Sequence, residues 1–220
     1  MTTQQNTDGD IEIEIWSDVA CPWCYIGKHR FLSALAEFEG RDRVNVVWRS
    51  YQLSPETPVG ERRSELDAWW RARACLPSRS VRCSDTLRAR RPARAESRLR
   101  HRDRRQHLRR PPVDPPGGRR ARCVVEELFR AHFGAGAVID DREVLVEIAS
   151  RAGLDADTVR AELESDAGAD AVRADLETAR RLQVSAVPFF VANRRVAVSG
   201  AQPKDVFLQL LTQAGAAPVN

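Results

Sequence analysis

Two cysteines near the N-terminus have the spacing of a redox-active pair. Cys21 and Cys24 are separated by Pro22 and Trp23, and a Cys-x-x-Cys motif beside a βαβ pattern is typical of thiol–disulfide chemistry. Pro22 suits the first position of a helix, where a missing amide hydrogen costs nothing. Cys21 would then lie at the helix N-terminus, where unpaired amides and the positive end of the helix dipole stabilise a thiolate and lower the thiol pKa.

The motif gives each cysteine a role. We expect Cys21 to be the attacking thiol and Cys24 to be the resolving thiol, which releases a mixed disulfide from Cys21. The alternative is half of a zinc site, which requires a second ligand pair at an orderly spacing. The remaining candidates do not supply one, so no metal is expected; they are Cys75, Cys83, His101, His107 and Cys123. The pattern demands no acid or base beside the thiols.

The residues around the motif predict a strand–helix–strand unit. Residues 11–16 alternate β-branched and charged side chains before becoming apolar, which predicts a strand. Apolar residues at helical spacing from Phe31 predict a helix that ends near Gly40. Residues 44–53 predict a second strand. The two cysteines therefore lie between the first strand and the helix.

The C-terminal third predicts a strand pair followed by a helix. Pro188 begins a short apolar strand at 188–192, a return strand follows at 196–198, and residues 203–211 form an amphipathic helix. Proline at the head of a strand is tolerated only in special places. One of these is a cis X-Pro turn, which exposes the preceding backbone to a partner.

Two stretches, residues 16–28 and 187–203, resemble the DsbA family of thioredoxin-fold oxidoreductases, in particular its FrnE-like branch. That branch is similar to 2-hydroxychromene-2-carboxylate isomerases and kappa-class glutathione transferases. The resemblance implies an α/β, thioredoxin-like fold with a helical insertion domain. In such proteins the loop proline is cis and lies against the active disulfide, a role that falls on Pro188. Val187 would pair with substrate by strand addition.

The resemblance also implies the division of the chain. Thioredoxin-like parts are expected at residues 11–56 and 183–215, with a helical insertion at 57–182. Pro22 and Trp23 join Val187 and Pro188 as expected substrate-binding residues. Within the insertion, the apolar spacing predicts four helices, at 124–133, 141–151, 155–165 and 169–182.

Residues 71–122 do not fit this pattern. They contain 18 arginines, four acidic residues and only six aliphatic ones, too few to offset the entropy of ordering the segment. We interpret the block as out of frame or disordered; a genuine basic linker and a nucleic-acid-binding arm are the alternatives. Without their normal cover, the apolar faces of the helices at 124–133 and 141–151 should be partly exposed.

The expected function is thiol–disulfide oxidoreductase or isomerase activity on protein disulfides or dithiols. It needs no cofactor beyond the Cys21–Cys24 disulfide, with glutathione as a candidate reductant. A second hypothesis is a glutathione-dependent isomerase or transferase acting on small electrophiles, but such relatives usually carry Ser in place of the first cysteine. A third is a basic nucleic-acid-binding module that depends on residues 71–122 and not on Cys21; nucleic acid is not the expected partner.

Composition limits the remaining classes. No apolar run approaches the roughly 18 residues of a membrane span, so we expect no membrane association. The polar N-terminus and the odd, small number of cysteines favour a cytoplasmic protein. A homo-oligomer is compatible with the sequence.

Overall fold

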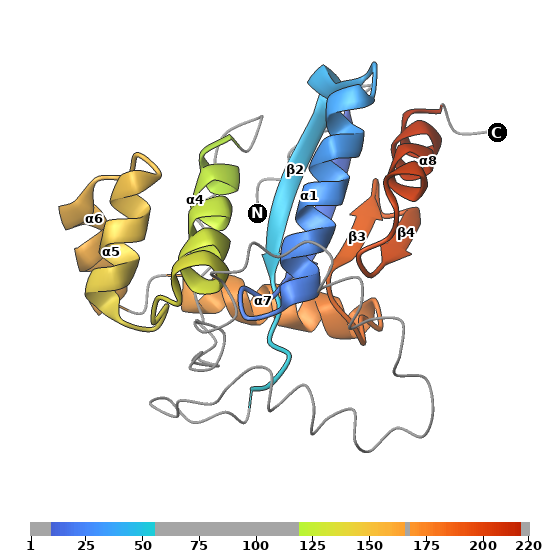
Figure 1. Cartoon of the computed structure of the whole chain (residues 1–220). Helices are drawn as coiled ribbons and strands as arrows, with labels where there is room; N and C mark the ends of the chain where they lie inside the picture. The colour runs from blue at the N-terminus through green and yellow to red at the C-terminus, as the bar shows by residue number, and fades with distance from the viewer. Residues whose placement is uncertain (1–9, 56–118, 166–167, 217–220) are drawn as a thin grey trace, which may run out of the picture.

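The computed structural model describes residues 10–55, 119–165 and 168–216. Within these residues the chain builds a four-stranded sheet in the order β2-β1-β3-β4 (Figure 1). β1 (Ile11–Ser17) runs parallel to β2 (Val44–Ser50) and antiparallel to β3 (Phe189–Ala192), which pairs antiparallel with β4 (Val196–Ser199). The sheet therefore joins the two ends of the chain, and the predicted α/β, thioredoxin-like class is confirmed.

Two helices cover one face of the sheet. α1 (Pro22–Glu37) and α8 (Lys204–Gly215) pack against each other in front of the strands (Figure 1). Phe31, Phe190 and Phe207 have no exposed surface, and their ring centroids lie 4.6–5.8 Å apart. Because side chains alternate along a strand, β1 adds three buried isoleucines to this face: Ile11, Ile13 and Ile15. Together these residues form the centre of the main core.

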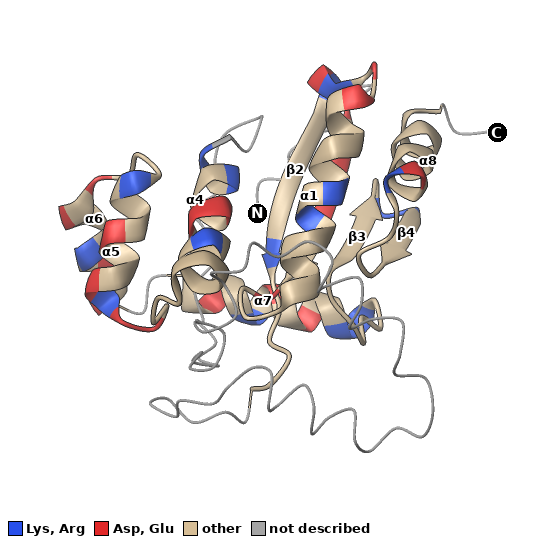
Figure 2. Ribbon diagram, viewed as in Figure 1, with Lys and Arg blue, Asp and Glu red and all other residues tan. Residues whose placement is uncertain are grey.

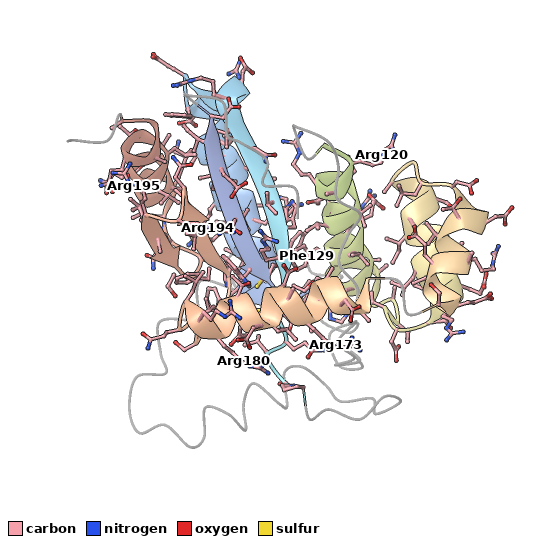
Figure 3. The ribbon with its side chains drawn as sticks, turned by 180° about the vertical axis from the view of Figure 1, so that it is seen from behind. Arg120, Phe129, Arg173, Arg180, Arg194 and Arg195 are labelled. Carbon is pink, nitrogen blue, oxygen red and sulfur yellow. The ribbon has the colours of Figure 1, made fainter. Side chains whose placement is uncertain are left out.

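The opposite face is crossed at one end by α7 (Ala169–Arg181), as the view from behind shows (Figure 3). Asp175 is buried and accepts hydrogen bonds from the Ser50 backbone N–H at 3.0 Å and from Arg49 Nη1 at 3.1 Å. The indole N–H of Trp16 donates to the Asp175 carbonyl at 3.1 Å. Polar contacts therefore hold α7 against the carboxyl ends of β1 and β2.

The same face holds a second buried carboxylate. Glu14, in the middle of β1, is 1% exposed and accepts a hydrogen bond from Arg49 Nε at 2.9 Å. Arg194, in the turn between β3 and β4, reaches across the back of the sheet and donates to Glu14 at 3.1 Å (Figure 3). Burial of a carboxylate is tolerated because its charge is paired in this way.

Three helices and a π-helical turn lie on the far side of β2. They are α4 (Arg119–Phe129), η2 (Arg130–Ala135), α5 (Arg142–Arg151) and α6 (Ala156–Glu164). α4 contacts α5, and α5 contacts α6 (Figure 1). Acidic and basic residues both lie on α5 and α6 (Figure 2), where pairs such as Arg160 with Glu143 are exposed and contribute little to stability.

The apolar faces of these helices are largely covered, and the expected exposure is limited to half-buried positions such as Leu128 and Val144. Val124, Val125 and Phe129 of α4 are at most 7% exposed, and Val146 and Ile148 of α5 are at most 5% exposed. The cover comes partly from α1, because the ring of Tyr25 stacks on the rings of two α4–η2 phenylalanines, Phe129 at 5.2 Å and Phe133 at 5.8 Å.

Most predicted boundaries agree with the structure within about two residues, with three corrections. The helix predicted to begin at residue 124 begins at Arg119, so the last four residues of the basic block are helical and not disordered. The last helix continues to Gly215, and β2 is shorter than predicted. That strand ends at Ser50, not at Leu53, because the Leu53 N–H donates to the Asp18 carboxylate at 2.9 Å and turns the chain out of the sheet. After α1 ends, the chain passes through η1 (Arg41–Arg43). The start of the predicted insertion and residues 71–118 of the basic block lie outside the described residues; residues 119–122 form the first turn of α4.

No helix in the described ranges has the length and apolar character that a bilayer crossing requires.

The Asp175 contacts predict a large stability effect. Asp175→Ala removes a buried partner of Arg49 and leaves the Ser50 N–H unsatisfied, so we expect the free energy of unfolding to fall by about 3 kcal/mol. Urea unfolding followed by circular dichroism measures this. Asp170→Ala is the matched control on the same helix, since its pair with Arg173 is exposed. Equal, small losses in both variants would contradict the prediction.

Candidate active site

Cys21 is the N-cap residue of α1, and Pro22 is the first residue of that helix. Cys21 has an extended backbone conformation, and its carbonyl accepts the first helical hydrogen bond, from the Cys24 N–H at 3.1 Å. Both thiols are free, and the two residues are 5% and 1% exposed. The sequence-based placement of the pair at a strand–helix junction is correct.

The surroundings of Cys21 favour its thiolate. The pKa of Cys21 is lowered, first by a hydrogen bond from the Cys24 thiol and then by the backbone N–H groups of Cys24 and Trp23. Burial and the negative charge of Asp18 act in the opposite direction. Helix-terminal amides thus contribute as the sequence predicted, but the largest contribution comes from the second thiol. A lowered pKa increases the thiolate fraction at neutral pH.

Cys24 has the opposite character. Burial raises its pKa well above the ordinary value, and the contact with Cys21 raises it further. The Asp18 backbone N–H donates to Cys24 Sγ at 3.5 Å. Cys24 is therefore a protonated thiol beneath a more acidic one, which is the arrangement that a resolving thiol needs.

The loop before β3 lies directly against Cys21. The Cys21 thiol donates to the Val187 carbonyl with an Sγ–O distance of 3.8 Å, and the Val187–Pro188 peptide bond is cis. The Pro188 carbonyl accepts from the Gly200 N–H at 2.7 Å, which fixes the loop to the segment after β4. The structure thus brings together Cys21, Cys24, Val187 and Pro188, with half-buried Pro22 and Trp23 between the two cysteines.

Gly27 lets α1 lie close to this loop, and sequence reasoning missed it. A Cβ atom on Gly27 would lie 2.6 Å from Pro188 Cγ and 3.5 Å from Ala201 Cα. Glycine inside a helix costs roughly 1 kcal/mol relative to alanine. A glycine one turn after the motif could therefore have indicated that another segment approaches the helix closely there. The absent side chain permits the contact between helix and loop.

Asp18 is a second residue that sequence reasoning did not place. It is 4% exposed, and its carboxylate accepts hydrogen bonds from the Ala20 N–H at 2.9 Å and the Leu53 N–H at 2.9 Å. Its carbonyl accepts from the Cys21 N–H at 3.0 Å. A buried acid therefore lies beside both thiols, three residues before the motif.

A charged contact anchors α1 on the side away from the loop. Lys28 is 1% exposed and donates to the Glu126 carboxylate of α4. Burial lowers the pKa of Lys28, and Glu126 partly offsets that effect.

Among the described residues, no three His, Cys, Asp or Glu side chains gather as a metal site.

The strand order, the helix that follows β1 and the paired thiols define a thiol protein of the thioredoxin class. The family model of the DSBA-like thioredoxin domain matches residues 12–89 and 117–212. The chain therefore belongs to this family of DsbA-like thiol–disulfide oxidoreductases, and the DsbA resemblance read from the sequence is confirmed.

Solved structures agree with this assignment. The chain is 36% identical to a probable DsbA oxidoreductase from Streptomyces coelicolor, with a TM-score of 0.73 over 96% of this chain and 93% of that one. A cytosolic disulfide reductase, DsbM from Pseudomonas aeruginosa, shares the fold at 18% identity and a TM-score of 0.56, over 92% of this chain and 98% of that one.

Curated relatives match over a shorter stretch. A protein named ClpXP adapter protein SpxH from Shouchella clausii is 34% identical over 79 residues. The match covers 33% of this chain and 26% of the relative, so the chain aligns with about a quarter of that protein's length.

The opposite pKa shifts predict selective alkylation. At mildly acidic pH, iodoacetamide should modify Cys21 before Cys24, because only Cys21 has a lowered pKa and Cys24 is a deeply buried thiol. Peptide mapping by mass spectrometry after short exposure identifies the site. Cys24→Ala serves as control, since its Cys21 loses the hydrogen-bond donor that most lowers its pKa and should react less readily at the same pH. Equal modification of both cysteines would rule out this assignment.

The contact at Gly27 predicts a loss on adding one methyl group. Gly27→Ala should lower the free energy of unfolding by about 1–3 kcal/mol through overpacking, and should slow disulfide exchange because the loop moves away from Cys21. Thermal unfolding and an insulin-reduction assay measure the two effects. Gly134→Ala is the control, because its Cβ would meet Arg130 Cγ at an ordinary 3.9 Å. If Gly27→Ala matched that control in both assays, the helix–loop contact would not matter.

Proposed function

We propose that this protein exchanges disulfides with protein substrates through Cys21 and Cys24. The observation that carries the proposal is the contrast within the pair. Cys21 has a lowered pKa and contacts the backbone of Val187, whereas Cys24 behind it has a strongly raised pKa. Cys21 is thus the nucleophile, and Cys24 is the resolving thiol, which stays protonated until a mixed disulfide has formed.

Reduction of a substrate disulfide proceeds in two exchanges. The Cys21 thiolate attacks one substrate sulfur; a mixed disulfide forms, and the other sulfur leaves as a thiolate that takes a proton. Cys24 then loses its proton and attacks Cys21 Sγ, which forms the Cys21–Cys24 disulfide and releases the second substrate thiol. The two electrons pass from the cysteine pair to the substrate. Oxidation of a substrate dithiol, and isomerisation through the mixed disulfide, use the same steps in other orders.

Protein substrates are proposed because of the backbone at the loop. Val187 lies just outside the start of β3, with its carbonyl beside Cys21 Sγ. An extended substrate segment that pairs with this backbone would bring its own sulfur to Cys21. Pro22 and Trp23, half-buried between the thiols, are proposed to contact the same segment.

We propose three further details. The protein belongs to the FrnE-like branch of the family, and glutathione is the reductant that regenerates its dithiol. It acts in the cytoplasm, which the small number of cysteines favours. A glutathione transferase or isomerase is less well supported, because Cys21 and Cys24 supply a complete dithiol where such relatives usually carry Ser first.

Trapping with single-cysteine variants tests the proposal. Cys24→Ser should accumulate a mixed disulfide between Cys21 and a disulfide-containing protein substrate, because no resolving thiol remains to release it. Non-reducing gels and mass spectrometry detect the adduct. Cys21→Ser, the matched control, should form none and should lose insulin reduction. An adduct of equal yield in both variants, or insulin reduction retained by Cys21→Ser, would contradict the assignment.

A further inference from the structure

The buried carboxylate of Asp18 joins two parts of the chain at the active site. It accepts from the Ala20 N–H in the loop before Cys21, and from the Leu53 N–H where the chain leaves β2. The main chain of Asp18 contacts both cysteines, since its carbonyl accepts from the Cys21 N–H and its N–H donates to Cys24 Sγ. Movement of Asp18 would therefore move both sulfurs.

The charge of Asp18 acts on Cys21 in an unfavourable direction. A thiolate on Cys21 and a carboxylate on Asp18 are like charges in a buried site, where screening by water is weak. The Asp18 charge raises the pKa of Cys21, against the hydrogen bonds that lower it. The site thus contains one group that opposes the thiolate that the others favour.

We propose that Asp18 is a positioning residue that also sets the redox balance of the pair: its carboxylate holds the loop in place, and its charge makes the reduced pair a better electron donor. This inference rests on the proposed function, because it concerns the same two thiols. It assigns a role to a residue outside the Cys-x-x-Cys motif and outside the Val187–Pro188 loop.

The direction follows from which redox form contains the thiolate. Only the reduced pair carries charge on Cys21, so a neighbouring negative charge destabilises the reduced form relative to the disulfide. A pair with a destabilised reduced form gives up its electrons more readily. Asp18 therefore shifts the protein toward reduction of substrate disulfides and away from oxidation of substrate dithiols.

Equilibration with glutathione tests this on the full chain. Glutathione disulfide takes two electrons from the pair, which forms the Cys21–Cys24 bond and yields two molecules of glutathione. In Asp18→Asn, which keeps one acceptor oxygen but no charge, the equilibrium should shift toward the reduced protein by on the order of tenfold. For a two-electron couple this corresponds to about 30 mV. Titration of the thiolate absorbance should show a lower Cys21 pKa.

Two further variants complete the design. Asp42→Asn removes an exposed carboxylate in η1, 93% exposed, and should leave both quantities unchanged. If Asp18→Asn does not fold, Asp18→Ser takes its place with the same expected direction, because its hydroxyl can still accept the Ala20 N–H without a charge. A folded Asp18 variant whose Cys21 pKa and glutathione equilibrium equal those of the natural protein, or move in the opposite direction, overturns the inference.

The two proposals can fail separately. If the natural protein equilibrates with glutathione but the Asp18 variant shows no shift, only the role of Asp18 is lost. If the natural protein never forms the Cys21–Cys24 disulfide, the proposed function fails. The thiolate titration still decides whether Asp18 opposes the Cys21 charge, because it requires only the reduced thiol.

Discussion

Helix α1 can approach the loop before β3 only because Gly27 has no side chain where Pro188 lies. That approach decides where Cys21 is held, since the thiol at the helix start must meet the Val187 carbonyl on the other side of the contact. The aromatic core of Phe31, Phe190 and Phe207, which lies between the two helices and the sheet, supports it. The active site therefore depends on the close packing of α1 against the loop that contains Val187 and Pro188.

Burial then separates the two thiols chemically. Removing a thiolate from water is costly, and Cys24, which is the more deeply buried, keeps its proton. Cys21 is buried too, but it gains hydrogen bonds from Cys24 and from the backbone N–H groups at the start of α1. Two cysteines three residues apart therefore have thiol pKa values shifted in opposite directions. The size of that difference depends on burial, which the local sequence does not show.

The strands, the helices and the reactive pair could be predicted because their signals are local. Alternation in residues 11–16 and Pro22 after Cys21 act over a few positions. The contributions of Asp18, Gly27 and Asp175 could not be predicted, because each depends on a partner distant in sequence. Leu53 meets Asp18, Pro188 meets Gly27, and Ser50 meets Asp175 only after the sheet has formed.

The inserted helices are better covered than expected for the same physical reason. The expectation assumed that residues 71–122 had to supply the cover, whereas α1 presents Tyr25 to the phenylalanines of α4 and η2. The thiol pair and its supporting contacts thus lie entirely on elements outside residues 71–118. Those contacts do not depend on how the basic block is interpreted.

Peptide mapping of the protein after oxidation by glutathione disulfide tests the central claim most directly. The chain has five cysteines, so several pairings compete for Cys21. The account predicts that Cys21 and Cys24 are recovered in a single disulfide-linked peptide, with Cys75, Cys83 and Cys123 outside it. Recovery of Cys21 joined to one of those three cysteines, or blocked as a stable glutathione adduct while Cys24 stays reduced, would contradict it.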